Sequence, residues 1–330
     1  ELSYTLMNLG ALEQVRSVPD IERSLRLLQA AVQYAQLSLM LDPDNTEYRR
    51  ALATELEWTA DAQMGICALG DALEVRQETV AVRRNIVQDD PENAEERMRL
   101  AFTLSGLAGV QQAIGLADSA NASFRESVDI LKAISAREPE NANLAWEAMY
   151  RESRLAHLLA ATGNQAAAAG MLTAIAPRVQ ELAGMGEVPG QFSEVDVELF
   201  KIDHARLLID RGAVDEGESR LRAATARLAE LTTEKPDFGN VVYALAIAYF
   251  EYWQHFGESP GEAVEPLLEP VELEPNDVMS CYDASISARL AVARGDLDRA
   301  EKLVDYVLQK GYFEPDFIAF CRRYELCEAH

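Results

Sequence analysis

Apolar residues recur at helical spacing along almost the whole chain. In the first forty or so residues, one helix face carries Leu2, Leu6, Leu9 and Leu12, and a second stripe carries Leu25, Leu28, Val32 and Leu39. The stripes are separated by Pro19-Asp20, which interrupts the helical pattern. No stretch alternates apolar and polar residues over the length that a strand requires. The pattern therefore predicts an all-α protein.

A short acidic proline motif separates successive helical patterns. It reads Asp42-Pro43-Asp44-Asn45, then Asp90-Pro91-Glu92-Asn93, then Glu138-Pro139-Glu140-Asn141. Weaker copies place further prolines at 189, 236, 275 and 315, so that the spacings are 48, 48, 50, 47, 39 and 40 residues. Proline ends a helix, and the asparagines at 45, 93, 141 and 276 suit the N-cap of the next one. Such a period is typical of a solenoid.

These junctions predict a single solenoid over residues 1–330, a right-handed superhelix of about seven antiparallel helix pairs. The turns within pairs are expected at Gly70-Asp71, Gly163-Asn164, Gly212, Gly257 and Gly295. A capping helix is expected from Pro315 to Leu326, since the last repeat would otherwise expose its apolar side. The breaker-rich segment 184–190 is either a longer junction or a hinge. Because the chain begins with Glu1, we expect it to be a fragment or a processed form of a longer protein.

Two stretches carry a family resemblance. Gly295-Asp296-Leu297-Asp298-Arg299-Ala300 and Asp90-Pro91-Glu92-Asn93-Ala94-Glu95 resemble the turns and helix starts of tetratricopeptide repeats. The period of 48 residues is similar to the long-helix variant found in bacterial multidomain signalling proteins. The resemblance implies a scaffold that binds peptides or protein surfaces on a concave side lined by the first helix of each pair. It does not extend to the Lys/Asn clamp that some members use for a C-terminal carboxylate.

The chain is strongly acidic, with 30 Lys+Arg against 55 Asp+Glu and a net charge of -25. This charge disfavours nucleic acid and anionic membrane surfaces as partners. Its simplest consequence is solubility, and its more specific one is a preference for a basic partner. No apolar run is long enough to cross a membrane. We expect a cytoplasmic protein, with a soluble domain of a membrane-anchored protein as the alternative.

No catalytic or metal-binding motif stands out. Nucleotide-binding glycine loops, His-Glu-x-x-His and Gly-x-Ser-x-Gly are absent from the sequence. Four cysteines are too few for a disulfide scaffold, and Cys321, Cys327 and His330 do not match zinc spacings. Most carboxylates fall on junctions or on helix faces expected to be solvated. We predict a protein without enzymatic activity, cofactor or metal.

Candidate partner-binding residues emerge when positions are counted from each junction proline. Offsets of 11, 15 and 18 residues lie on one helix face and collect aromatic residues together with Arg, His and Asp. Aromatic and Arg residues dominate protein-binding hot spots, although aromatic residues at this spacing are more often part of a core. The predicted partner-binding residues are Trp58, Asp61, Arg99, Phe102, Tyr150, Arg154, His157 and His204.

The leading hypothesis is a protein-interaction module that forms the regulatory or sensor region of a larger signalling protein. Two alternatives remain open. The array could be a homodimerisation module, or it could sense a small ligand in a pocket beside Trp58, Tyr150 and Arg154. A further aromatic cluster, Tyr249, Tyr252, Trp253 and His255, is either a second contact patch or the packing of a shorter repeat.

Overall fold

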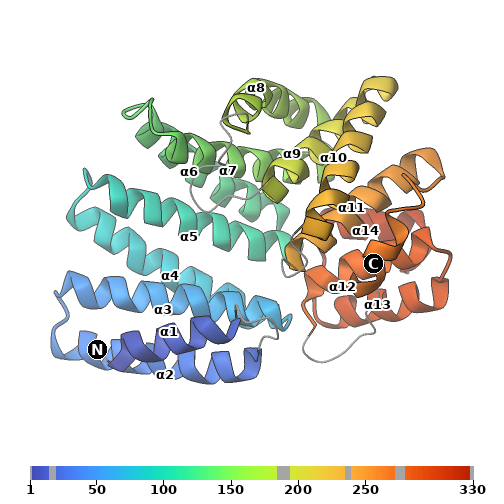
Figure 1. Cartoon of the computed structure of the whole chain (residues 1–330). Helices are drawn as coiled ribbons and strands as arrows, with labels where there is room; N and C mark the ends of the chain where they lie inside the picture. Colours follow the sequence, from blue (N-terminus) through green and yellow to red (C-terminus); the bar gives the residue numbers. More distant parts are fainter. Residues whose placement is uncertain (1, 15–19, 184–193, 235–238, 272–278, 328–330) are drawn as a thin grey trace. The chain divides into compact units, whose positions relative to one another are not determined.

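The computed structural model describes residues 2–14, 20–183, 194–234, 239–271 and 279–327. Over these ranges every regular element is a helix, which confirms the all-α prediction. The described helices follow one another as seven pairs and a final single helix. They divide into two compact units (Figure 1). The prediction of one continuous right-handed superhelix stays a prediction, because each unit is described by itself.

Unit 1 comprises Glu1–Ile134 together with the short segments Asn276–Cys281 and Lys310–Glu314. Its helices are α1 (Leu2–Gln14), α2 (Ile21–Leu41), α3 (Thr46–Gly65), α4 (Leu69–Asp89), α5 (Ala94–Ala113) and α6 (Ala117–Ser135, of which the last residue belongs to unit 2). From α1 to α5 each helix packs against the next in the chain. α6 is joined to α5 by a hydrogen bond from the Ser127 hydroxyl to the Ala101 carbonyl, 2.6 Å long.

Unit 2 comprises Ser135–Pro275, Tyr282–Gln309 and Pro315–His330. Its elements are α7 (Ala142–Ala161), α8 (Gln165–Ala183), α9 (Glu194–Asp210), α10 (Val214–Glu234), α11 (Gly239–Phe256), the 3₁₀ helix η1 (Glu265–Val271), α12 (Cys281–Ala293, of which Cys281 belongs to unit 1), α13 (Leu297–Gln309) and α14 (Pro315–Arg323). One large apolar core runs from α9 through α11 and η1 into α12. In the pair that starts with α11, η1 takes the place of a long second helix. Pro270 lies inside η1, and proline interrupts the hydrogen bonding of an α-helix.

The three strongest junction motifs have one local structure, which matches their expected role. Asn45, Asn93 and Asn141 are the N-caps of α3, α5 and α7, and each side-chain oxygen accepts a hydrogen bond from a backbone amide of the first turn. Each asparagine side chain also donates to the acidic residue before the proline, at 2.9–3.2 Å. The motif is thus held together by its own hydrogen bonds, and its asparagine caps the next helix. The fourth predicted cap, Asn276, lies outside the described residues.

Four of the five predicted turns have a glycine with positive φ, namely Gly163, Gly212, Gly257 and Gly295. The fifth prediction is corrected by the structure. Gly70 and Asp71 lie inside α4, and the left-handed position between α3 and α4 is taken by Cys67, with φ of 59°. Cys67 is buried and forms a disulfide with Cys281, with the two Cα atoms 5.2 Å apart. This pairing was not predicted from the sequence.

The candidate hinge at 184–190 lies outside the described residues. Most carboxylates were expected at junctions and on solvated faces, and the buried glutamates that are exceptions include Glu55, Glu96, Glu147, Glu152, Glu198 and Glu251. A buried carboxylate needs a partner of opposite charge or a hydrogen-bond donor. Several of these partners lie on the first helices, where the candidate sites are.

Candidate functional site

Side chains about 46 residues apart join the first helices of neighbouring pairs. In unit 1, Arg50 on α3 reaches Glu96 on α5, a separation of 46 residues. In unit 2, His157 on α7 faces Asp203 on α9, again 46 residues apart, and Arg206 on α9 faces Glu251 on α11, 45 residues apart. These separations are shorter than the proline spacing, so the contacts join positions that are not equivalent in neighbouring repeats. Polar side chains of one first helix consistently meet those of the next.

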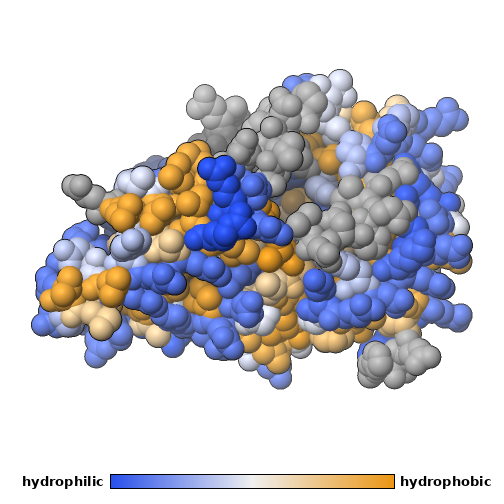
Figure 2. Space-filling model, turned by 90° about the horizontal axis from the view of Figure 1, so that it is seen from below, coloured by the Kyte–Doolittle hydropathy of each residue, from blue (hydrophilic) through white to orange (hydrophobic). Residues whose placement is uncertain are grey.

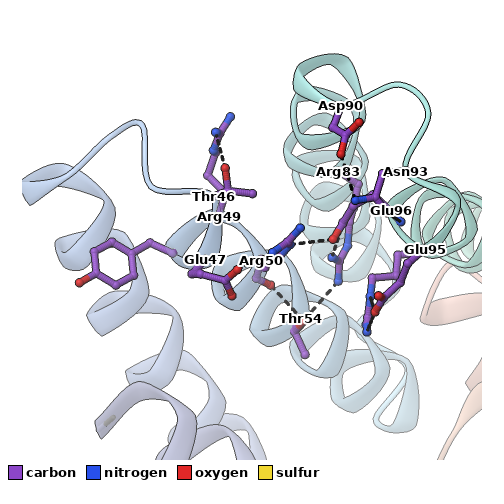
Figure 3. A network of polar contacts seen from close by, with 12 residues as sticks. Thr46, Glu47, Arg49, Arg50, Thr54, Arg83, Asp90, Asn93, Glu95 and Glu96 are labelled. Carbon is purple, nitrogen blue, oxygen red and sulfur yellow. Dashed lines mark hydrogen bonds and ion pairs between the residues drawn. The ribbon is translucent and has the colours of Figure 1, made fainter.

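The first helices of unit 1 are linked by a partly buried cluster that we call the unit-1 polar cluster. It consists of Arg50, Thr54, Glu57, Arg83, Glu96 and Thr103. Arg83 comes from the second helix α4, is only 1% exposed, and donates to both carboxylate oxygens of Glu57 at 3.3 and 3.2 Å. Figure 3 shows the Arg83 guanidinium directed at Thr54, and Arg50 directed at Glu96, to which it donates at 2.7 Å. The cluster satisfies its own charges within unit 1.

The four predicted residues of unit 1 have different surroundings. Trp58 packs against the apolar cluster that includes Met7 and Leu28, so we leave it out of the proposed site. The Asp61 carboxylate accepts a hydrogen bond from Arg76 of α4 and keeps an exposed side. Arg99 is exposed and pairs with Glu95 one turn earlier at 2.8 Å, while Phe102 beside it is half-buried. We call Asp61, Arg99 and Phe102 the unit-1 face.

In unit 2, a second cluster of charged side chains gathers on the first helices, and we call it the unit-2 polar cluster. It consists of His157 (α7), Asp203 and Arg206 (α9), Glu251 (α11), Arg289 (α12) and Asp316 (α14). The Asp316 carboxylate lies between two arginines, with one oxygen 3.3 Å from Arg206 and the other 3.1 Å from Arg289. Arg206 also reaches Glu251 at 3.3 Å. Four first helices and α14 therefore contribute to one network.

The electrostatics of the unit-2 polar cluster favour ionised groups. Burial alone would lower the pKa of Arg206, but the carboxylates of Asp316 and Glu251 outweigh it, and the pKa is raised. Burial alone would raise the pKa of Asp316, but Arg206 and Arg289 hold it well below its usual value. The same competition raises the pKa of His157, which burial would lower, because the Asp203 carboxylate faces it at 3.2 Å. Such opposed shifts indicate ion pairs.

The predicted residues of unit 2 divide between this cluster and the core. His157 is a member of the cluster, and Arg154 interacts electrostatically with Asp203. Tyr150 is half-buried, with the Arg151 guanidinium 5.5 Å from its ring centre. His204 instead lies buried beside Phe200, at a ring distance of 6.0 Å. Burial and the neighbouring Arg220 of α10 lower its pKa.

The starting point of the count decides whether His204 or Arg206 is selected in α9. α7 begins three residues after Pro139, whereas α9 begins five residues after Pro189. When positions are counted from the first residue of each helix, Arg206 in α9 is equivalent to Arg154 in α7, since both lie twelve residues further on. Counting from Pro189 and counting from the first residue of α9 therefore select positions two residues apart, about 200° around a helix. We replace His204 by Arg206 in the proposed site.

The aromatic cluster noted in the sequence contributes to packing within unit 2. Tyr249 and Tyr252 are buried, and the Tyr252 hydroxyl lies 3.0 Å from Glu218 of α10. Trp253 and its neighbour Phe250 pack on α14 and the residue that follows it, with ring distances of 5.9 Å from Trp253 to Tyr324 and 5.5 Å from Phe250 to Phe320. We define the unit-2 face as Tyr150, Arg154, His157, Arg206, Phe250, Trp253 and Arg289.

The described residues offer neither a membrane-spanning helix nor a cluster of metal ligands. No helix among them is long and apolar enough to cross a membrane. Within the same ranges, no group of three or more His, Cys, Asp or Glu side chains is arranged to hold a metal ion. His330 of the metal set weighed above lies outside the described residues. The proposed pocket of Trp58, Tyr150 and Arg154 draws on both units, so its residues are described only separately.

Comparisons with known proteins add structural likeness only. No family model matches the sequence, and no curated protein matches it. A tetratricopeptide repeat protein from Parabacteroides merdae is similar at 16% identity and a TM-score of 0.45, over 97% of this chain and 94% of that one. Yeast Tom70 is similar at 12% identity and a TM-score of 0.42, over 99% of this chain and 64% of that one. BtubC from P. vanneervenii gives 16% identity and a TM-score of 0.33, over 88% and 91%. The all-α fold of helix pairs rests on the helices described above.

Proposed function

We propose that this chain is a non-enzymatic protein-interaction scaffold that binds a protein or peptide along the first helices of its pairs. The observation that carries the proposal is the composition of the unit-2 face. Arginines and aromatic rings lie together there, and these residue types provide most of the energy in protein interfaces. The half-buried Phe102 and the exposed Arg99 give the unit-1 face a related composition. A regulatory or sensor role in a signalling protein is the finer proposal, supported by the resemblance of the long repeat.

The net charge of -25 adds one expectation about the partner. Long-range attraction by an acidic surface speeds the approach of a basic protein, and this attraction weakens as salt is added. We therefore expect a partner with a basic region, and an association rate that falls with ionic strength. The unit-2 face differs locally from this overall acidic charge, because its arginines favour a partner group that carries a carboxylate.

Site-specific photo-cross-linking in the native organism tests the proposal. A photoreactive amino acid is placed in turn at Arg99 on the unit-1 face and at Arg154 on the unit-2 face. Matched controls carry it at Glu78 of α4 and Gln180 of α8, which are exposed positions on second helices. We expect protein adducts from the first-helix positions and none from the controls. Adducts of equal yield from all four positions would overturn the assignment to first helices, and adducts from none would overturn the interaction function.

Self-association is a second candidate, favoured by exposed apolar side chains on α1 and α2. Leu12, Leu37, Met40 and Leu41 are 54–88% exposed. Figure 2 shows apolar surface between polar residues on the side of the N-terminal helices. Exposed apolar patches of this kind often mark protein contacts. Sedimentation of the wild type beside a Met40→Lys/Leu41→Lys variant separates the candidates, since a dimer through this patch would dissociate in the variant and a monomer would not change.

A further inference from the structure

The C-terminal helix α14 is bound to unit 2 by the first helices and not as one more repeat. It packs on α7, its Asp316 contacts Arg206 of α9 and Arg289 of α12, and its rings contact Phe250 of α11. Figure 1 shows α14 beside α11 and α12. A terminal cap covers the exposed face of the final repeat. Contacts that reach back to α7 and α9 are instead those of a segment lying across several repeats.

Charge holds the start of α14. Arg206 and Arg289 are almost fully buried, with side chains 12% and 11% exposed, and each contacts a different oxygen of Asp316. Aspartate in the first turn of a helix is also favoured by the helix dipole. The two arginines therefore recognise a carboxylate in the first turn of a short helix. Removing that carboxylate leaves two buried positive charges without this partner.

Aromatic contacts hold the rest of α14. The Arg289 guanidinium lies 5.3 Å from the Phe317 ring centre and 5.2 Å from that of Phe320. Phe320 packs edge-on against Phe250, and Tyr324, just after the helix, lies near Trp253. The pattern is a carboxylate followed by aromatic residues one and four positions later. Anchors at this spacing are those of an amphipathic helix bound in a groove.

α14 depends on these contacts for its structure. It has nine residues, and a helix of that length is marginal on its own in water. Its buried side chains are Phe317, Phe320 and Cys321. Helix formation and binding are therefore coupled, as they are for a peptide that folds on its partner.

We propose that α14 is an intramolecular ligand of the unit-2 face and that an external partner displaces it with a short helix of the same pattern. This inference rests on the proposed interaction function and specifies the partner's chemistry. The displacing segment carries an aspartate or glutamate in its first helical turn and aromatic residues one and four positions later. The unit-2 face is then closed in the isolated chain and open once α14 leaves.

Cys321 offers a direct probe of α14 release. It lies in α14, is 0% exposed, and is free of the disulfide between Cys67 and Cys281. In the 330-residue chain with Cys327→Ser, Cys321 becomes the remaining free thiol, and its reaction with a thiol reagent measures how often α14 is undocked. The probe ligand is a synthetic peptide of residues 314–326 with Cys321→Ser, used beside the same peptide with Asp316→Lys.

We expect the acidic peptide to accelerate the modification of Cys321 in a saturable way, and the Asp316→Lys peptide to have no effect. In the chain itself, Asp316→Lys should accelerate modification by about tenfold or more, because a buried charge pair becomes a repulsion. Asp305→Lys, the same charge change at an exposed position of α13, should leave the rate unchanged. Circular dichroism checks that the variants keep their helices.

A slow rate that responds neither to the acidic peptide nor to Asp316→Lys would overturn the proposal and make α14 a fixed part of the fold. The peptide arm uses no substitution in α14, so a variant that fails to fold does not decide the result. The outcome also differs from failure of the proposed function. If Arg154 cross-links to a partner while Cys321 stays protected, displacement of α14 is refuted and the proposed scaffold function still stands.

Discussion

The two units place their buried arginines in opposite roles. In unit 1 the first helices contribute the carboxylates of Glu57 and Glu96, and Arg83 from the adjoining second helix pairs with them. In unit 2 the first helices contribute Arg206 and Arg289, and the carboxylate of Asp316 comes from α14. The partner of Arg83 is 26 residues away in the chain, whereas Asp316 lies 110 residues from Arg206.

This difference in distance along the chain has a mechanical consequence. The Arg83 pair lies inside one helix pair, so breaking it means opening α3 from α4. The Arg206 pair breaks when a single nine-residue helix leaves. The unit-1 polar cluster therefore stays intact unless the packed helices separate, whereas the unit-2 polar cluster loses Asp316 when α14 undocks. Local opening of a protein requires least free energy where few contacts are lost.

The largest expected effects come from the two buried arginines. Arg83→Met and Arg206→Met should each lower the free energy of unfolding by up to about 3–5 kcal/mol, because each removes a buried guanidinium that compensates two carboxylates of its cluster. Urea denaturation measures the loss. Arg206→Met should also expose Cys321 to thiol reagent, and Arg83→Met should not. Equal Cys321 reactivity in the two variants would contradict the comparison.

The disulfide should stabilise unit 1 specifically. Replacing Cys67 and Cys281 by alanine should cost about 2–4 kcal/mol, because a long loop is no longer closed in the unfolded chain. Amide hydrogen exchange should show lost protection at the ends of α3 and α4, with α9 to α11 unchanged. Thiol titration of the unfolded wild type should give two free thiols before reduction and four after it. Four thiols without reduction would show that the bond is absent.

In unit 1, Glu55 should make stability fall as pH rises. Burial raises its pKa to about 7, although the Ser3 hydroxyl donates to it. Because the folded state binds this proton more tightly than the unfolded state does, stability is lost between about pH 4.5 and 7. Glu55→Gln should therefore add about 2 kcal/mol at pH 8 and little at pH 4.5. Thermal unfolding at the two pH values tests this, and an equal effect at both would refute it.

In unit 2, His157 gives a smaller pH effect. Its pKa is raised in the folded protein, since Asp203 outweighs burial. Its stabilisation is complete below the unfolded pKa of about 6.5 and is lost as pH rises through the folded value. His157→Gln should cost more stability at pH 6 than at pH 9. Asp203 must be ionised in this window, and its lowered pKa satisfies that requirement. Arg154, which also interacts electrostatically with Asp203, is present in both the wild type and the His157→Gln variant.

The smallest effects should be equal in the two units. Asn93→Ala in unit 1 and Asn141→Ala in unit 2 each remove an N-cap with the same hydrogen bonds. Each should cost about 1 kcal/mol, the usual value for such a cap. Chemical denaturation of both variants checks the equality. A much larger loss for either would mean that its junction also supports tertiary contacts.

Much of the fold could be predicted because its signals are local. The capping asparagines, the glycine turns and the apolar stripes all involve residues within one or two helical turns of each other. Cys67 was missed because its left-handed conformation accompanies a bond to a residue 214 positions away. Tertiary context of this kind overrides the preference for glycine at the turn.

The candidate site was predicted less completely. His157 was proposed from its offset and lies in the unit-2 polar cluster, whereas Arg206 lies in the same cluster and was not proposed, because counting from Pro189 selects His204. Counting from the first residue of each helix would have selected Arg206 beside Arg154. Burial of Arg83 left no sign in the sequence, since a long charged side chain on an amphipathic helix is usually solvated.

The sequence by itself determined the helix pairs, their junctions and the all-α class, because propensity, capping and periodicity act between near neighbours in the chain. The tertiary structure decided which charges are buried, which cysteines pair, and that α14 lies on the first helices of unit 2. Those outcomes depend on residues that are tens to hundreds of positions apart. Their energies arise from desolvation and close contact, which exist only once the helices have packed.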